Sequence, residues 1–307
     1  MNRLSIEERS KIVRLLVEGT SLRSCSRIMD MSINTITKVL EKVGAACQQF
    51  HNDTVVNVNS KRVEADEIWS FVYAKEKNVQ YTKKSDEEGV GDAWTWVGID
   101  ADTKLVVSWL VADRDAASAN EFALDVASRL RNRIQLTTDG LKFYLDAIEN
   151  AFDNNIDFAQ LVKTYGIGES ETTEKRYSPA TVTGIKKKWV SGDPNPDLIS
   201  TSYVERQNLT MRMGMRRFTR LTNAFSKKIE NHSYAIAIHF VYYNFVRMHK
   251  TLKTTPAMSA KLTKTFMTIE DIVRYAYADE TAKENKRLAR MNRPQIVENP
   301  ILLKSIV

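Results

Sequence analysis

The sequence has little cysteine and no hydrophobic run as long as the roughly 20 residues that a membrane-spanning helix requires. Cys25 and Cys47 are the only cysteines among 307 residues, and neither belongs to a CxxC pair. A structural zinc site or a disulfide framework is therefore not expected, and a reducing cytosol fits the composition. The first residues, MNRLSIEERSKIV, lack the apolar centre of a secretory signal. We expect a cytoplasmic protein that has no membrane partner.

Charge is distributed unevenly along the chain. Residues 1–60 hold 8 Lys and Arg against 6 Asp and Glu, residues 61–199 hold 18 against 24, and residues 200–307 hold 19 against 8. An acidic middle beside a strongly basic end suggests a metal-binding centre flanked by a surface for a polyanion. A solvated basic tail would give the same charge balance.

The N-terminal residues 1–48 predict three short helices. Ser5 and Glu8 form a capping-box pattern at the start of the first helix, and the tight turn DMS precedes the third. This succession is typical of a helix-turn-helix domain, whose last helix lies in the DNA major groove. The polar positions that would contact base edges and phosphates are Asn34, Thr35, Thr37 and Lys38. An ordinary three-helix bundle with a solvated face is the alternative.

A mixed sheet is predicted to follow the polar linker at 49–60. The strand RVEADEIWSFVYAK precedes a hairpin, AWTWVGID-ADTK-LVVSWLVA, and then helices and strands alternate in the order α-β-α-β. This pattern indicates an α/β domain over 61–255, with helices packed on the sheet. Residues 166–200 are polar and hold three of the six prolines, so we expect a loop or insertion there. Residues 256–307 read as a basic C-terminal helix and tail.

Three carboxylates could converge at one point of this sheet. Asp66 lies inside a strand, where aspartate is rare and costly to bury, and Asp139 ends the strand IQLTTD. The two strands can be parallel neighbours joined by a right-handed crossover. Glu205 opens a later helix, although Ser202 before it could form a plain capping box. Three such oxygen donors suit Mg²⁺ or Mn²⁺. Glu67 should point to the opposite face of its strand and take no part.

The segments that hold these carboxylates resemble a known family. ADEIWSFV, TTDG and YVERQNLTMR are similar to the three catalytic boxes of DDE transposases with an RNase H-like core, above all those of the insertion-sequence-one family. YYNFVRMHKTLKTTPAM resembles a segment that follows the glutamate in many such enzymes, so the likeness spans roughly 61–258. It implies that Asp66, Asp139 and Glu205 are the catalytic, metal-binding triad. The 66 positions from Asp139 to Glu205 are a long spacing for this family.

Basic residues surround the glutamate of the third box. They would neutralise DNA phosphates around the reaction centre, although a solvated helix face would also explain them. These residues are Arg206, Arg212, Arg216 and Arg217.

Four tryptophans, Trp69, Trp94, Trp96 and Trp109, lie in strand patterns. We expect them in the core; stacking of an unpaired DNA base on one of them is the alternative.

The resemblance implies a DNA transposase of an insertion sequence, acting in the bacterial cytoplasm at the nucleoid. It would bind terminal inverted repeats in double-stranded DNA, cleave them with Mg²⁺ or Mn²⁺, and join the free end to a target. Because both ends of the element must be processed, the resemblance implies a homo-oligomer. A DNA-binding regulator that has lost catalysis is one alternative. A nuclease of the same fold that does not rejoin strands is another.

Overall fold

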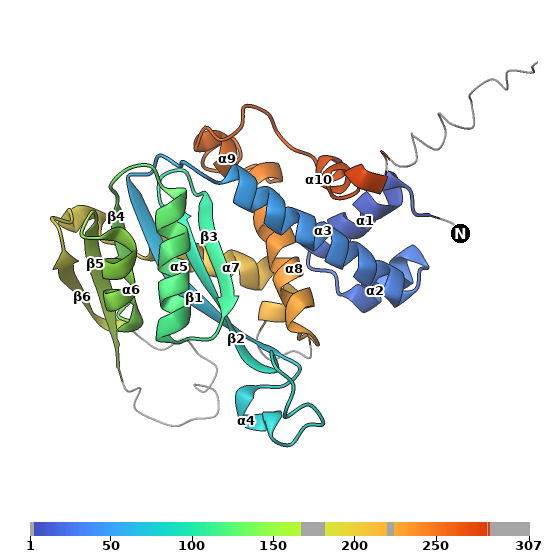
Figure 1. The fold of residues 1–307 in the computed structure, drawn as a ribbon, viewed down its shortest axis with the longest axis horizontal. Helices are drawn as coiled ribbons and strands as arrows, with labels where there is room; N and C mark the ends of the chain where they lie inside the picture. The colour runs from blue at the N-terminus through green and yellow to red at the C-terminus, as the bar shows by residue number, and fades with distance from the viewer. Residues whose placement is uncertain (1–2, 167–181, 220–223, 281, 283–307) are drawn as a thin grey trace, which may run out of the picture.

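A computed structural model describes residues 3–166, 182–219, 224–280 and 282 of the chain (Figure 1). Within these residues, none of the helices combines the length and the apolar character needed to cross a membrane. The elements form a sheet covered by helices, with a group of N- and C-terminal helices beside it. The N-terminal helices are α1 (Ile6–Val17), α2 (Leu22–Met29) and α3 (Ile33–Thr54).

The three expected N-terminal helices are present, and their caps follow from local sequence. Ser5 and Glu8 make the reciprocal hydrogen bonds of a capping box at α1. Ser21 and Ser32 cap α2 and α3. Helix α3 extends through Thr54, into the range that we expected to be a linker. Its apolar face continues beyond position 48 because the helix packs on later parts of the chain.

The N-terminal helices share one hydrophobic core with the C-terminal third of the described chain. Helix α3 crosses α8 (Ile229–Val241) closely at Gly44, where a Cβ atom would lie 2.3 Å from the Cβ of Tyr234. Buried Ile12, Leu40 and Phe245 belong to the same cluster. The remaining elements of this part are η4 (Tyr242–Val246), α9 (Pro256–Ser259) and α10 (Ile269–Ala276). The N-terminal helices are therefore packed against the rest of the molecule.

The six-stranded sheet has the order β3-β2-β1-β4-β5-β6. The predicted hairpin is confirmed, because β1, β2 and β3 pair antiparallel in sequence order. The predicted parallel pairing is also confirmed, since β1 pairs with β4 and β4 pairs with β5 in parallel. The strands are β1 (Arg62–Val72), β2 (Gly91–Asp100), β3 (Val106–Ala112), β4 (Gln135–Thr138), β5 (Asp157–Tyr165) and β6 (Val182–Ser191). The short helix α4 (Glu76–Val79) lies between β1 and β2.

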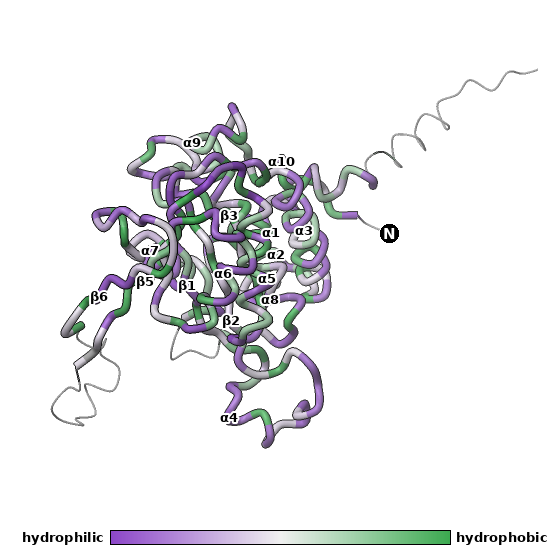
Figure 2. The backbone as a smooth tube through the Cα atoms, turned by 60° about the vertical axis from the view of Figure 1, so that its left-hand side comes forward, coloured by the Kyte–Doolittle hydropathy of each residue, from purple (hydrophilic) through white to green (hydrophobic). Residues whose placement is uncertain are grey.

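Helices cover both faces of this mixed sheet. On one face, α5 (Ala116–Arg129) and α6 (Phe143–Phe152) enclose a core around Trp96, Phe122 and Phe158. On the other, α7 (Ser202–Gly214) and α8 pack over Ile68 and Val97. In Figure 2 the apolar segments lie mainly inside this layered body, whereas the extension around α4 is largely hydrophilic. The short turns η2 (Pro196–Leu198) and η3 (Arg216–Phe218) flank α7.

The expectation that residues 166–200 form a loop or insertion was wrong for their second half. Residues 182–191 form β6, which pairs antiparallel with β5 at the edge of the sheet. Its side chains are almost all exposed, including Lys187 and Trp189. A strand exposed on both faces needs no apolar alternation, so its composition resembles that of a loop. Residues 167–181 lie outside the described part of the chain.

Candidate active site

The sheet places Asp66 and Asp139 side by side. In the parallel pairing of β1 with β4, Ala65 lies opposite Thr138, and an aspartate directly follows each of these two residues in the sequence. Strand β4 ends at Thr138, and the Asp139 carboxylate accepts a hydrogen bond from the Leu141 N–H at 2.9 Å. Asp139 therefore makes a turn hydrogen bond and also lies beside Asp66.

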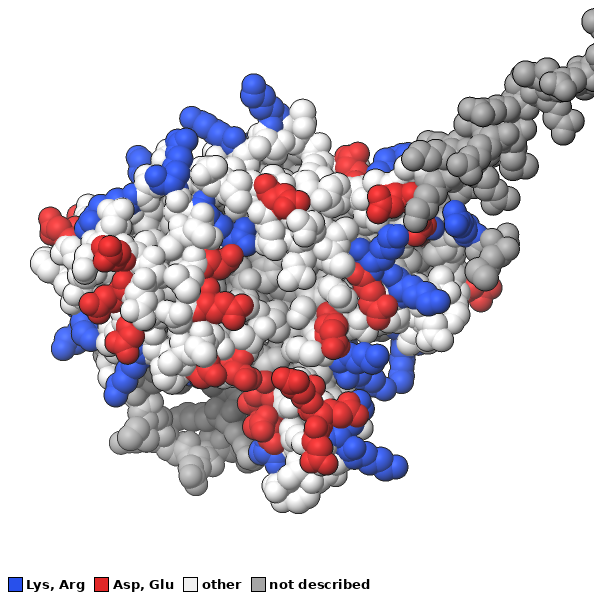
Figure 3. Space-filling model, in the orientation of Figure 1, with Lys and Arg blue, Asp and Glu red and all other residues white. Residues whose placement is uncertain are grey.

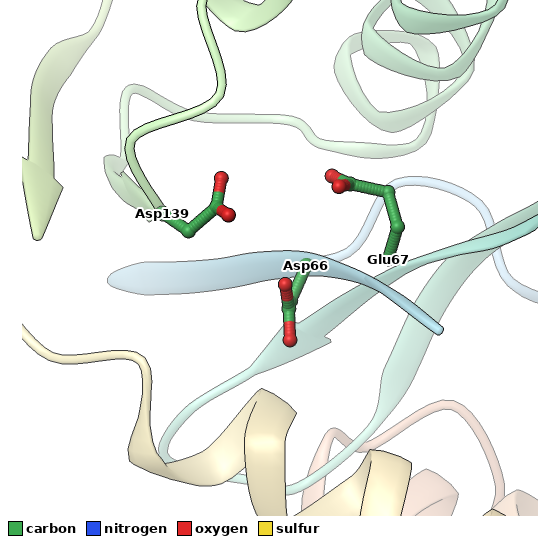
Figure 4. A group of neighbouring side chains, drawn as sticks. All are labelled: Asp66, Glu67 and Asp139. Carbon is green, nitrogen blue, oxygen red and sulfur yellow. The ribbon is translucent and has the colours of Figure 1, made fainter. Parts of the chain in front are cut away.

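Glu67 joins these two aspartates. One carboxylate oxygen each from Asp66, Glu67 and Asp139 lies within 4.8 Å of the others. In Figure 4, Glu67 and Asp139 point toward one another on one side of β1, and Asp66 projects to the other side. The predicted alternation of the two neighbours is therefore present, although Glu67 lies close enough to Asp139 to belong to the acidic group. Asp139 lies beyond the end of its strand, where it can approach side chains on both faces of β1.

Arg114, which precedes α5, holds the buried member of this acidic group. Its Nε donates to Glu67 Oε2 at 3.1 Å, and its Nη2 lies 4.0 Å from Asp139 Oδ2. The Glu67 side chain is 1% exposed, against 38% for Asp139. A buried carboxylate with a guanidinium partner is partly neutralised, whereas Asp139 can reach solvent and a ligand.

Two members of the group bind protons more readily than usual. Burial, followed by the nearby charge of Asp139, raises the pKa of Asp66 to about 7. The same two causes raise the pKa of Glu67 to about 7. Crowded acids of this kind are common at functional sites, because a cation that binds there relieves the repulsion.

These raised values predict that the metal-free protein loses stability as pH increases. Between the ordinary values near 4 and the folded values near 7, the folded state binds more protons than the unfolded chain. The free energy of unfolding should therefore fall across that interval by several kcal/mol, since about three pKa units on one group correspond to about 4 kcal/mol, and level off above it. Urea denaturation in EDTA at pH 5 and pH 8 measures this change. Asp66→Asn should reduce the difference in unfolding free energy between the two pH values. An equal difference in the variant and in wild type would contradict the raised pKa of Asp66.

Glu205 lies at the first turn of α7, near Asp66 but outside the three-carboxylate group. Its charge contributes to the raised pKa of Asp66. Its Oε1 accepts a hydrogen bond from the Thr201 hydroxyl at 2.6 Å and pairs with Lys163 of β5. Asn208, one turn later on α7, donates to Asp66 Oδ2 at 2.9 Å. Residues three apart share a helix face, so this contact turns the Glu205 side of α7 toward Asp66.

Glu64 anchors the helix that carries Glu205, and we did not single it out from the sequence. This residue of β1 is 1% exposed, and its Oε2 accepts the backbone N–H groups of Tyr203 and Val204 at 2.7 and 3.1 Å. The Ser202 capping box was therefore wrong: the N-cap residue is Thr201, without a side-chain cap bond, and a carboxylate from the sheet serves instead. The sequence did contain a signal for this role of Glu64. It is an acid two residues before Asp66, and residues two apart in a strand lie on the same face.

Removing this cap should weaken the attachment of α7. We expect Glu64→Ala to lower the free energy of unfolding by about 1–3 kcal/mol, because two buried N–H groups lose their acceptor. Glu64→Gln keeps an oxygen in place and should lose less. Urea denaturation at pH 7 compares the variants, and equal stability of Glu64→Ala and wild type would contradict this role.

The expected DNA-contacting positions of the third helix lie at its start. Asn34 and Lys38 are exposed, and Thr35 and Thr37 are partly exposed. The Thr37 hydroxyl donates to the Ile33 carbonyl at 2.9 Å. Thr37 also lines a cleft of about 1170 Å³ between the N-terminal helices and the segment from η3 to α8.

The four predicted arginines separate into different roles. Arg206 and Arg216 are exposed, and Arg216 lines the same cleft as Thr37. Arg212 is partly exposed at the end of α7. Arg217 points inward: its Nη1 donates to Ser226 Oγ at 3.0 Å and to the Asn231 carbonyl at 2.7 Å, and burial lowers its pKa to about 10.

The structure gives Arg217 partners within the protein, and the expectation that it contacts DNA stays a prediction. Its guanidinium joins a buried network in which Ser226 also bonds His232, and this network holds the segment before α8 in place. Adjacent arginines look equivalent in sequence, but the turn at η3 points one outward and one inward.

Comparisons with known proteins give weak likenesses. No protein-family model matches the sequence, and no curated protein matches it. A solved structure of a piggyBac transposase synaptic complex with hairpin DNA aligns with 96% of this chain and 75% of its own, at 10% identity and a TM-score of 0.37. A pre-cleavage Mos1 transpososome aligns with 87% of this chain and 82% of its own, at 11% identity and a TM-score of 0.26.

Proposed function

We propose that the chain is a DNA transposase with an RNase H-like catalytic domain, which cleaves and joins DNA strands at the ends of an insertion sequence. The observation that carries the proposal is the pair Asp66 and Asp139, which directly follow Ala65 and Thr138, the last paired residues of two adjacent parallel strands. Both belong to sequence boxes that resemble those of DDE transposases. The third box, on α7, faces the same place through Asn208.

The donor set fits a hard divalent cation. Carboxylate oxygens are the ligands that Mg²⁺ and Mn²⁺ prefer, and the crowding of Asp66 and Asp139 is relieved by positive charge. Asp66 and Asp139 would hold the metal, and Glu205 would complete a ligand shell from the α7 side. Such ions polarise a phosphodiester and activate the attacking oxygen in phosphoryl transfer.

The chain's own residues would prepare this reaction in distinct ways. Asn208 donates to Asp66 and so fixes the direction of that carboxylate. Arg114 holds Glu67 and leaves the more exposed Asp139 available. Lys163 pairs with Glu205 and partly neutralises its charge. Glu64 keeps α7 docked against β1.

DNA would contact exposed residues on several elements. Asn34, Thr35, Thr37 and Lys38 lie at the start of α3, and Arg206, Arg212 and Arg216 lie on or after α7. On the face drawn in Figure 3, Asp and Glu gather around α4, whereas Lys and Arg project from the upper edge. Phosphates would avoid the acidic region. Because two element ends must be processed together, the active form would be a homo-oligomer on double-stranded DNA.

Sequence-selective binding should depend on the start of α3. We expect Asn34→Ala to lower discrimination against altered end sequences by about 1–3 kcal/mol, and Lys38→Ala to weaken binding evenly across sequences. Competition binding with end and scrambled duplexes measures both, with Lys11→Ala on α1 as a control. Point variants are preferable to removal of residues 1–48, which would expose the core shared with α8. Unchanged discrimination in Asn34→Ala would contradict this reading.

A strand-transfer assay tests the proposal as a whole. A duplex that carries the native element's end and its flank, labelled at the 5′ terminus of the strand whose 3′-hydroxyl is freed by cleavage, is incubated with the protein, Mg²⁺ or Mn²⁺, and a target plasmid. The proposal predicts label covalently joined to the plasmid. Cleavage at the boundary without joining would indicate a nuclease, and selective binding without cleavage would indicate a regulator.

A further inference from the structure

Two of the four strand tryptophans are not core residues. Trp96 is fully buried and Trp109 packs against Phe240, as expected. Trp69 and Trp94 are partly exposed, and neither belongs to a hydrophobic cluster of the described residues. They lie directly opposite each other in the pairing of β1 with β2. The expectation that all four tryptophans build the core was therefore wrong for this pair.

A row of aromatic rings continues from this pair along β1. Phe71 lies two residues after Trp69, on the same strand face, with ring centroids 5.7 Å apart. The ring of Phe225 stacks on Phe71 at 5.3 Å. Glu67 lies two residues before Trp69 on that face, so the row begins beside the acidic group and runs toward the end of β1. We call Trp94, Trp69 and Phe71 the aromatic row.

Cations lie over both ends of the aromatic row. The Arg114 guanidinium lies 4.8 Å from the centre of the Trp94 ring, and the same group contacts Glu67. Lys75 Nζ lies 5.7 Å from the Trp69 ring and 6.0 Å from the Phe71 ring. Rings interleaved with positive charges, next to a site for phosphoryl transfer, match the chemistry of an unpaired nucleic-acid strand.

We propose that the aromatic row binds unpaired nucleotides of a DNA strand and leads that strand to the acidic group at Asp139, which lies on the Glu67 side of β1. Bases would stack on the rings, and Arg114 and Lys75 would neutralise the adjoining phosphates. An intact duplex keeps its base faces stacked and cannot use ring platforms, so the row selects a strand whose end is melted. This inference rests on the proposed function, because it states that the DNA substrate of that function is unpaired near the cleavage position.

Fluorescence anisotropy of a labelled short oligothymidylate tests the aromatic row without requiring catalysis. Trp94→Leu and Trp69→Leu should each weaken binding by between about five- and a hundredfold, since each removes one stacking surface. Trp94→Phe keeps a ring and should lose much less. Trp189→Leu is the control, because this tryptophan is 59% exposed on β6, at the far edge of the sheet. Circular dichroism confirms that each variant is folded.

A second comparison separates this inference from the proposed function. Wild type should cleave an element end with a few unpaired terminal nucleotides faster than a fully paired end, and Trp94→Leu should remove that advantage while keeping metal-dependent cleavage. Suppose that wild type cleaves the element end, but both leucine variants bind oligothymidylate as tightly as wild type. That result would overturn this inference and leave the proposed function intact. A smaller oligomer for Trp94→Leu, with unchanged oligothymidylate affinity, would show that the row contacts a second copy instead, and would also overturn it.

Discussion

Asp139→Asn is expected to abolish metal-dependent cleavage at the element end while leaving affinity for that end unchanged. Asparagine has nearly the same shape and can keep the turn bond to Leu141. It lacks the negative charge that a divalent cation requires. Loss of several kcal/mol of charge stabilisation corresponds to a rate lower by at least about a thousandfold. Gel-based cleavage of a labelled duplex and a binding titration on the same duplex measure the two quantities.

Asp102→Asn is the matched control for this substitution. Asp102 also lies in a turn of the sheet, where it pairs with Arg62, and it is not a member of the group of Asp66, Glu67 and Asp139. It should leave cleavage near the wild-type rate. Cleavage by Asp139→Asn at a rate close to that of wild type would remove Asp139 from the site.

Glu205→Gln and Glu67→Gln are expected to differ strongly. The family resemblance makes Glu205 the third metal ligand, whereas the structure places Glu67 nearer to the two aspartates. We assign the role to Glu205, because Glu67 is buried and already paired with Arg114. Glu205→Gln should lower cleavage by about a hundredfold or more, since a neutral amide is a poor ligand for Mg²⁺. Glu67→Gln should retain most activity.

The reverse ranking would reassign the site. If Glu67→Gln abolished cleavage and Glu205→Gln did not, the metal would lie between Asp139 and Glu67 on the α5 side of β1. Raising the Mn²⁺ concentration separates weak metal binding from a lost catalytic group, because only the former recovers at high metal concentration.

Patterns with strong local causes were predictable from the sequence. The three N-terminal helices follow from Ser caps and apolar periodicity, and the β2–β3 hairpin follows from two β-rich runs around a polar turn. The parallel neighbours β1 and β4 follow from the crossover rule, and that rule placed Asp66 beside Asp139.

Features that depend on tertiary packing were not predictable in this way. Strand β6 has no buried face and hence no pattern. The Glu64 cap joins residues about 140 positions apart, so no local motif reveals it. The inward turn of Arg217 depends on a buried network with Ser226 and Asn231. Glu67 enters the acidic group because Asp139 lies beyond its strand end and can reach both faces of β1.

The most direct test of the central claim is cleavage of a labelled duplex carrying the native element's end, with Mg²⁺ or Mn²⁺, by wild type and by Asp66→Ala. We predict nicking at the element boundary that requires the metal and vanishes in the variant. Equal nicking by both proteins, or selective binding by both without any nicking, would contradict a catalytic role for this acidic group.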